Sequence, residues 1–457
     1  MRSREGSITR RSFLTGASAV AAGAGVTGLL TAAGGDSPVN SPASGPVAKK
    51  KLGGSLEVWG VVSFTPAGDA LLGQQMKDWG AKNGVSVTYT AVPGTDYETK
   101  VGAAIQAGAL PDVVMLEGTD PIYYGSQGHI IDITDVYHSV KNLGGGLYES
   151  VMTYCTLHGK VVAIPMQVAP TLLYSRLDMC EKATGKRAAP STLDELESIA
   201  EKVNNPPNFY SIGLTLGKTA DSGDIVDIME AEGGTYVDKH GNPNIGNPGM
   251  VAALSRIKRW WDKKLINPAS LTANDSWNNN QYQAGQCAFV WNPASIYAYL
   301  QTNDQSLLQN TSQGPLPSHK KSAQSAGPWE WSVSATSKNK QAAKELIKAI
   351  MQPDQLEAVY EKVDGRWYPV YKDLPARPFW KSNQYFAQFP DLISHTQADW
   401  YPAKASAKLL SQLTAFETAY IIAQETQTVL LQGVSPKQAA QAMQQQMEQI
   451  FQANASG

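Results

Sequence analysis

The first part of the chain switches between two patterns of hydrophobic and polar positions. Some stretches alternate at every second residue or form a short apolar run, which is typical of strands, and others repeat apolar residues at helical spacing. Strands are expected at residues 55–59, 84–91 and 112–116, and helices at residues 68–83 and 95–107. This order of strand, helix, strand, helix and strand predicts an α/β fold with a parallel sheet and right-handed crossovers.

The rest of the chain is richer in helical patterns. A capping-box sequence at Thr192–Glu195 and an apolar stripe from Met250 to Leu265 each predict a helix, and Ser435–Pro436 is typical of a helix start. Helical spacing leads us to assign Trp79, Trp260 and Trp261 to packing. The other expected elements are strands at residues 161–165, 286–291 and 330–335 and a helix at residues 340–351.

Polar and aromatic side chains follow the predicted strands of the first part. Trp59 and Ser63 come after the first strand, Glu117 after the third, and Gln167 after the strand at residues 161–165. In parallel sheets, ligands bind beyond the carboxyl ends of the strands. Carboxylates accept hydroxyl groups and aromatic faces pack on sugar rings, so these residues suit a polar ring-shaped ligand. The structural alternatives are core packing for Trp59, helix capping for Glu117 and a loop position for Gln167.

The N-terminus has the pattern of an export signal. Arg10 and Arg11 precede a stretch from Gly16 to Leu30 that carries no charge and is rich in small residues, and it is too short and too weakly apolar for a comfortable membrane span. The paired arginines resemble the twin-arginine class. We expect a signal at residues 1–33 and a flexible tether at residues 34–54, which is rich in Gly, Ser and Pro.

Lipid anchoring is doubtful from the sequence alone. The stretch before residue 34 resembles a lipoprotein cleavage box, but Ala33 stands where the lipid-bearing cysteine belongs. Cleavage without lipidation and descent from an anchored parent remain open as explanations. The protein is expected to be exported, to the cell surface or the periplasm.

Composition narrows the function classes. Removal of residues 1–33 takes four of the 38 basic and one of the 40 acidic residues, which leaves a formal charge of −5 and no electrostatic footprint for nucleic acid. The remaining length, roughly 400 residues, favours two domains. Cys155, Cys180 and Cys287 allow at most one disulfide. Eleven tryptophans and nineteen tyrosines against nine phenylalanines again suit a polar, ring-shaped ligand.

Several short motifs occur in an order that resembles the family 1 extracellular solute-binding proteins, the group that includes maltose-binding protein. Gly-Ala-Leu-Pro-Asp-Val-Val resembles the family's Gly-x-x-Pro-Asp-Val motif, and Pro-Ser-Thr-Leu-Asp-Glu-Leu is similar to its helix start. In the segment Tyr-Gln-Ala-Gly-Gln-Cys-Ala, Gln286 replaces the common lysine. The motifs lie at residues 108–114, 158–165, 173–176, 190–196, 282–288 and 337–343.

The resemblance implies a two-lobed periplasmic-binding-protein-like fold, with a ligand cleft between lobes joined by crossing hinge segments. Lobe one would take residues 55–167 and 317–368, and lobe two residues 168–316 and 369–457. The implied function is that of an extracytoplasmic receptor of an ABC importer that captures a sugar or oligosaccharide by hinge closure. The implied partners are the carbohydrate ligand and the permease subunits, with a monomeric protein, no enzymatic activity and no cofactor.

Residues carried over from the family extend the candidate ligand site. Asp221 precedes a helix where relatives often place an acidic sugar contact, and Trp291 ends a strand near a position that is often aromatic. Trp329 lies in a segment where relatives carry a Gly-rich turn facing the cleft. Arg366 and Trp367 precede a proline, as in the family's last crossing. The polar run from Asn274 to Gln281 adds Trp277.

Other chemistries are less well supported. Gly213–Thr219 looks like a phosphate loop but has its first glycine one residue too close, and the six histidines lie too far apart for a metal site. Asp221, Asp224 and Asp227 near a helix start are typical of capping. The main alternatives are a secreted glycosidase, whose cleft would also combine aromatics and carboxylates, and a receptor of the same fold for a polyol, peptide or polyamine.

Overall fold

The computed structural model describes residues 52–323, 325–395 and 406–454. The export signal expected at residues 1–33 lies outside the described residues, as does the tether up to residue 51. Among the described helices, none is both long and apolar enough to cross a membrane. Cys155, Cys180 and Cys287 are all buried free thiols, so none of them forms a disulfide.

The first sheet has five strands in the order β2-β1-β3-β10-β6. Strand β1 pairs in parallel with both β2 and β3, which confirms the predicted order of alternating strands and helices. Strand β10 lies antiparallel between β3 and β6. The strands span Ser55–Val61 (β1), Ser86–Val92 (β2), Val113–Glu117 (β3), Ile164–Pro170 (β6) and Ala326–Val333 (β10).

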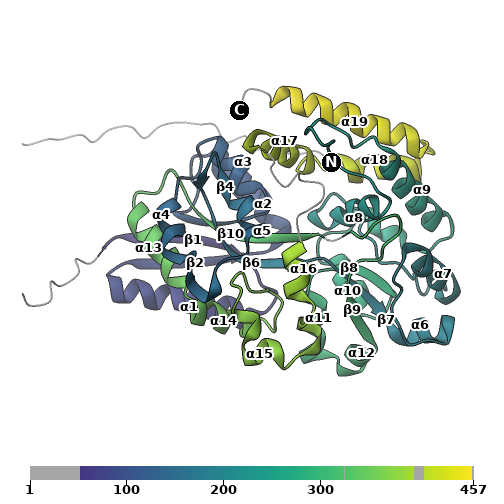
Figure 1. Ribbon diagram of the computed structural model, residues 1–457, viewed down its shortest axis with the longest axis horizontal. Helices are drawn as coiled ribbons and strands as arrows, with labels where there is room; N and C mark the ends of the chain where they lie inside the picture. The colour runs from purple at the N-terminus through teal and green to yellow at the C-terminus, as the bar shows by residue number, and fades with distance from the viewer. Residues whose placement is uncertain (1–51, 324, 396–405, 455–457) are drawn as a thin grey trace, which may run out of the picture. The chain divides into compact units, whose positions relative to one another are not determined.

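Helices cover this sheet, with α1 and α14 below the strands and α2 and α3 above them in the view of Figure 1. Gly80 allows α1 to approach the chain that follows it, because a Cβ there would lie 2.4 Å from the carbonyl oxygen of Val85. The helices are α1 (Pro66–Asn83), α2 (Gly94–Gln106), α3 (Asp120–Ser126), α4 (Thr134–Val140), α5 (Glu149–Met152), α13 (Lys340–Ile350) and α14 (Pro353–Lys362), and a small ribbon is formed by β4 (Thr156–Leu157) and β5 (Lys160–Val161).

The second sheet is antiparallel, with the strand order β8-β7-β9. All four residues of β8 are buried, as its continuous apolar sequence predicts. The strands are β7 (Leu172–Arg176), β8 (Phe289–Asn292) and β9 (Thr311–Gly314). The helices of this part are α6 (Leu177–Thr184), α7 (Leu193–Val203), α8 (Asp224–Ala231), α9 (Pro248–Asp262), α10 (Trp277–Gln283), α11 (Ser295–Asn303) and α12 (Gln305–Gln309).

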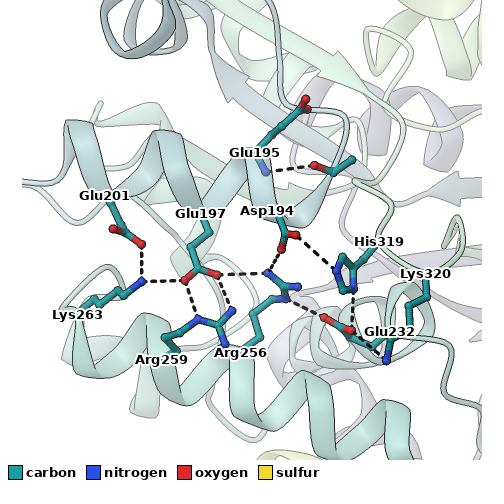
Figure 2. Close-up of polar contacts among 11 residues, drawn as sticks. Asp194, Glu195, Glu197, Glu201, Glu232, Arg256, Arg259, Lys263, His319 and Lys320 are labelled. Carbon is teal, nitrogen blue, oxygen red and sulfur yellow. Dashed lines mark hydrogen bonds and ion pairs between the residues drawn. The ribbon is translucent and has the colours of Figure 1, made fainter.

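An ion-pair network joins three helices of this second part (Figure 2). Arg256 of α9 is buried and its guanidinium binds Glu232, just after α8, at 2.8 Å and Asp194 of α7 at 2.8 Å. Arg259 adds two bonds of 2.7 Å to the carboxylate of Glu197 on α7. Burial works to raise the pKa of Glu197, but the hydrogen bonds from Arg259 and Lys263 outweigh it and lower the pKa to about 2. The network fixes α7, α8 and α9 to one another.

Three segments of the chain run side by side where the two sheets are connected: the link from β6 to β7, the link from β9 to β10 and the segment around Tyr368. Strand β6 leads to β7 and β9 leads back to β10, and Ala326 pairs with Pro170 in the ladder between β10 and β6. The amide of Thr171 donates to the carbonyl of Ser325 at 2.9 Å, and Val168 forms a bridge with Tyr368. The connections between the sheets are therefore hydrogen-bonded to one another.

Three C-terminal helices complete the fold. Helix α17 packs against α3 and α19, whereas α18 and α19 both pack against α9 (Figure 1). Ser435 and Gln438 form the full capping box expected at the start of α19. The last helices are α15 (Pro378–Lys381), α16 (Phe389–His395), α17 (Ala407–Glu417), α18 (Ile421–Leu431) and α19 (Pro436–Ala453).

Some element boundaries differ from those that the sequence predicts. Strand β10 begins four residues earlier than expected because β6 also continues to Pro170, and the two extensions pair with each other. The capping box expected at Thr192 is only half formed, since the Glu195 carboxylate binds Ser191 instead of the Thr192 backbone. The predicted limits of the two lobes stay a prediction.

Candidate ligand-binding cleft

A cavity of about 390 Å³ is lined by residues from both sheets and from the C-terminal helices. This volume lies within the range of roughly 300–1,000 Å³ that is usual for small-molecule sites. Its aromatic lining comprises Phe64, Tyr154, Tyr236, Trp291, Trp329, Trp367, Phe416 and Tyr420. The cavity therefore offers both apolar faces and polar groups to a ligand.

Glu117, Trp329 and Gln167 form a row across one wall of the cavity. Trp329 of β10 is the register partner of Glu117 on β3 and of Gln167 on β6. Residues directly opposite each other on neighbouring strands project on the same side of a sheet, so the three side chains are neighbours. The ring of Tyr97 supports Trp329 in an edge contact, with centroids 5.9 Å apart.

Polar residues around the start of α8 and α10 form a second wall. The Thr219 hydroxyl accepts the amide of Asp221 at 3.2 Å and is also bonded to the carboxylate of Asp275. The Asn279 amide, on α10, donates to the Ser295 hydroxyl at 3.1 Å. All five of Thr219, Asp221, Asp275, Asn279 and Ser295 line the cavity.

Arg366 is a cation held against the carboxylates of the cavity. Its guanidinium lies 4.4 Å from the ring centre of Phe64 and donates to the carbonyl of Val62 at 3.4 Å. Burial lowers the pKa of Arg366 to about 10, although Asp69, Asp221 and Glu117 work in the opposite direction. The guanidinium remains charged at neutral pH and offers donors to a ligand.

Burial changes the ionisation of the carboxyl groups around the cavity. Burial and the carboxylates of Glu98 and Glu417 raise the pKa of Asp120 to about 8. Burial and Asp275 raise that of Asp221 to about 8, against the opposing effects of Asn278 and Arg366.

Burial also raises the pKa values of Glu117, Asp224 and Asp227. Burial raises the pKa of Asp227 to about 7, against a hydrogen bond to Ser325. Burial, followed by the charges of neighbouring carboxylates, raises the pKa values of Glu117 and Asp224 well above the usual range. These groups therefore hold protons at pH values where exposed carboxyls do not.

Seven of the ten residues predicted from the sequence lie together around this cavity. Two of them are almost fully buried, since Trp291 and Trp367 are 1 % and 2 % exposed, and Trp291 also packs against Trp260. Contact with a ligand stays a prediction for all seven. They are Glu117, Gln167, Asp221, Trp291, Trp329, Arg366 and Trp367.

Trp59, Ser63 and Trp277 are not among the cavity-lining residues. Strand β1 continues two residues past Trp59 to Val61, which lines the cavity in its place, and the Trp59 ring is covered by Lys100 at 3.8 Å. The Ser63 side chain is buried in the turn before α1, where it donates to the carbonyl of Thr65 at 3.0 Å.

Trp277 is displaced by the phase of its helix. It is the first residue of α10, and Asn279, two residues further on, lines the cavity. Residues two positions apart do not share a helix face, so the two side chains project in different directions. The polar run was a useful signal, but Asp275 and Asn279 rather than its tryptophan border the cavity.

Most of the acidic lining was not predicted from the sequence. Asp120 follows Glu117 by three residues and lies at the same strand end, so this position offered a signal. Asp224 and Asp227 were interpreted as helix caps, yet they are 7 % and 4 % exposed and line the cavity. Glu98 and Glu417 lie on α2 and α17 and had no recognisable signal.

The two sheets, their hydrogen-bonded connections and the lined cavity define a two-lobed α/β binding protein of the periplasmic solute-binding class. The family model "Bacterial extracellular solute-binding protein" matches residues 74–388. The chain belongs to this family, which confirms the resemblance found in the sequence motifs.

Individual relatives agree with this assignment. A Deinococcus radiodurans protein named "Probable ABC transporter-binding protein" is 26% identical over 399 residues, which cover 81% of this chain and 88% of that relative. A solute-binding protein from Thermotoga lettingae, solved with alpha-D-tagatose, is 20% identical with a TM-score of 0.75, covering 87% and 99% of the two chains. Maltose-bound MalE3 from T. maritima is also 20% identical, with a TM-score of 0.74 and coverage of 86% and 99%.

Proposed function

We propose that this protein is the extracytoplasmic receptor of an ABC importer and that it captures a sugar or a sugar-like polyol. The observation that carries the proposal is the row of Glu117, Trp329 and Gln167 along a cavity of the solute-binding fold. An aromatic face between a carboxylate and an amide suits a ring that carries hydroxyl groups on its edges. The fold of the solved sugar-bound neighbours is consistent with such a ligand.

Binding is proposed to close two lobes around the ligand, which the connections near Thr171, Ser325 and Tyr368 would permit as a hinge. Small-angle scattering is expected to give a smaller radius of gyration at saturating ligand than without ligand. An unchanged radius at saturation would contradict closure.

A thermal-shift screen over sugars and polyols tests the proposed ligand class, because a ligand that binds only the folded protein raises its melting temperature. A product assay on each hit then separates a receptor from a glycosidase. A receptor leaves the bound sugar intact over hours, whereas turnover would favour the enzyme.

Export through the twin-arginine pathway belongs to the same proposal. Arg10 and Arg11 precede the apolar segment of the expected export signal, as in the twin-arginine class. The exported receptor would deliver its ligand to the permease of the importer in the membrane. Replacing both arginines with lysine is expected to retain the precursor in the cytoplasm, as measured by fractionation. Unchanged export of this variant would contradict the twin-arginine assignment.

A further inference from the structure

Carboxyl groups are the most numerous ionisable groups in the cavity lining. Among the described residues that line it, eight carry a carboxyl group and a single side chain, Arg366, is a permanent cation. A neutral sugar needs one or two carboxylates to accept its hydroxyl groups, so this excess calls for a further explanation. The eight residues are Glu98, Glu117, Asp120, Asp221, Asp224, Asp227, Asp275 and Glu417.

Buried acceptor atoms on the cavity wall lack donors. Asp224 is 7 % exposed and Gln167 is 1 % exposed, and the Oδ2 atom of Asp224 and the Oε1 atom of Gln167 receive no hydrogen bond within the described chain. The Oδ2 atom of Asp221 is in the same situation. Buried polar atoms are costly unless they are bonded, so these acceptors point to a ligand that brings donors.

The arrangement of the carboxyl groups favours an organic cation over a metal ion. No group of three or more His, Cys, Asp or Glu side chains in the described residues is placed to hold one metal ion. An ammonium group carries three donors and no acceptor, which matches oxygen atoms that are spread along a wall. The half-buried ring of Trp329, next to Glu117, adds an aromatic face to which a cation is attracted.

We propose that the ligand of this cleft is a hydroxylated organic cation, an amine-bearing sugar or polyol, rather than a neutral sugar. This inference rests on the proposed function, since it names the chemical class that the receptor takes. The ammonium group would lie near Asp221 and Asp224, where acceptors lack donors, and the hydroxyl groups would meet Glu117 and Gln167.

The raised pKa values of the carboxyl groups in the cavity wall are consistent with the same ligand. Asp221 faces Asp275 and Arg366, Asp224 faces Asp221 and Asp227, and Glu117 faces Glu98, Asp120, Asp275 and Asp221. A bound ammonium favours the ionised forms, so binding lowers the pKa values of these carboxyl groups and releases protons. For glucamine, a primary alkylamine whose pKa lies well above 8, affinity is therefore expected to rise from pH 6 to pH 8, because this ligand stays charged throughout that range.

Matched ligands test the proposal directly. Calorimetry would compare glucosamine with glucose and N-acetylglucosamine, and glucamine with sorbitol, in two buffers of different ionisation enthalpy so that proton release is measured. We expect the free amines to bind about tenfold or more tightly than their uncharged counterparts, with protons released when glucamine, which is already fully charged, binds. Equal or tighter binding of the neutral sugars would overturn the inference and leave the sugar receptor intact.

Spermidine, a cation without hydroxyl groups, separates the two parts of the ligand. Tighter binding of spermidine than of every hydroxylated amine would overturn both this inference and the proposed sugar function. Binding of none of these probes would likewise count against the inference. Weak binding of spermidine beside strong binding of an amino sugar would support it.

A single substitution gives an independent readout. Asp224→Asn keeps the shape of the side chain but removes its ability to ionise, so it is expected to weaken amine binding by about tenfold and to change the affinity of neutral analogues by much less. The same variant should melt at an equal or higher temperature, because a buried carboxyl beside Asp221 and Asp227 is lost. Asp78→Asn, on the exposed face of α1, is the matched control. Equal effects of the two substitutions on amine affinity would contradict the proposal.

Discussion

Trp59 and Trp329 are tryptophans of the same sheet, and their different surroundings show how finely single positions decide ligand access. Trp329 stands between Glu117 and Gln167 in the register and borders the cavity. Trp59 donates its indole N–H to the carboxylate of Glu57 at 2.8 Å and is covered by Lys100. The sequence pattern placed the end of β1 at Trp59, two residues before its end at Val61. This difference was enough to assign Trp59 to the cavity in place of Val61.

Substitution of these tryptophans separates the two roles. Trp329→Ala is expected to weaken ligand binding by several-fold to about tenfold, because the stacking face is lost. Trp59→Ala serves as the control and is expected to leave affinity unchanged. Calorimetry with a melting curve for each variant makes the comparison, and an equal loss of affinity in both would place the site elsewhere.

Glu330 is a buried acid on β10, next in sequence to the cavity-lining Trp329. It is fully buried on β10, and neither of its carboxylate oxygens receives a hydrogen bond from the described residues. Burial, followed by the charges of Glu117 and Asp120, raises its pKa well above the usual range. The folded protein therefore keeps this proton at pH values where the unfolded chain has lost it.

Glu330→Gln is expected to stabilise the protein more at pH 8 than at pH 5. The native Glu330 costs stability increasingly as the pH rises above about 4.3, the pKa of an unfolded glutamate, whereas glutamine has no proton to lose. Melting temperatures of both proteins at the two pH values measure the difference. The exposed change Glu448→Gln on α19 should show no such trend, and a larger gain at pH 5 would contradict the interpretation.

Cavity residues at the ends of predicted strands were easier to identify from the sequence than those on helices. Glu117 was found because polar residues at the ends of apolar strands gather at one edge of a sheet. Gln167 was found by the same rule, although β6 continues past it to Pro170. Glu98 and Glu417 were not found, since they come from helices whose approach to that edge depends on tertiary packing. Asp224 was interpreted as a cap because local sequence shows the helix start but not the burial around it.

At the scale of elements, periodicity predicted most helices and strands and misjudged some of their ends. Strand β8 begins at Phe289 rather than at residue 286, because the amide of Gln286 still belongs to the turn after α10, where it donates to the carbonyl of Gln281 at 2.9 Å. The extension of β10 to Ala326 depends on its pairing with β6, which is distant in sequence. Such pairing cannot be inferred from the local pattern of either strand.

The helices α7, α8 and α9 depend on a buried cation for their mutual placement. Arg256→Met is expected to lower the free energy of unfolding by about 3–5 kcal/mol, because Glu232 would be left buried with its main partner removed. Lys258→Met, on the same helix, removes an i,i+4 pair with Asp262 and should cost about 0.3–0.5 kcal/mol. Denaturant unfolding measures both, and equal losses would show that the network contributes no more than a surface pair.

At the scale of the whole molecule, the raised and lowered pKa values set a stability profile. Asp120, Asp221 and Asp227 have folded-state pKa values of about 7 to 8, so between roughly pH 4 and pH 8 the folded protein binds more protons than the unfolded chain. Their unfavourable ionisation therefore lowers stability as the pH rises through this window. Glu197, with a pKa of about 2, has the opposite effect, because its ionised form stabilises the folded protein. This stabilisation is lost only as the pH falls below about 4.

The ligand-free protein is accordingly expected to melt at a higher temperature at pH 5 than at pH 8. Differential scanning calorimetry across this range measures the trend, and the double variant Asp221→Asn, Asp227→Asn should flatten it. A melting temperature that climbs steadily from pH 5 to pH 8 in the unsubstituted protein would show that other groups control its acid response.

The two-lobed architecture was accessible from the sequence because short motifs in a fixed order resembled a known family, and the fold agrees with that resemblance. Periodicity alone gave the parallel strands β1, β2 and β3 of the first sheet, which follow one another along the chain. The contact of α17 with α3 was not predicted, because the two helices are far apart in the sequence and neither carries a local pattern that indicates its partner.

That contact has a consequence for the order of events during synthesis. Thr414 is hydrogen-bonded to Thr119 across 295 positions, and the Tyr420 hydroxyl donates to Glu98 across 322 positions. Domains begin to fold while the chain is still being made, N-terminal parts first. The first sheet lacks its interior strand β10 until residue 333 is made, and the cavity lacks one wall until α17 and α18 leave the ribosome. Ligand recognition is therefore a property that a nascent chain acquires only after α17 and α18 have been made.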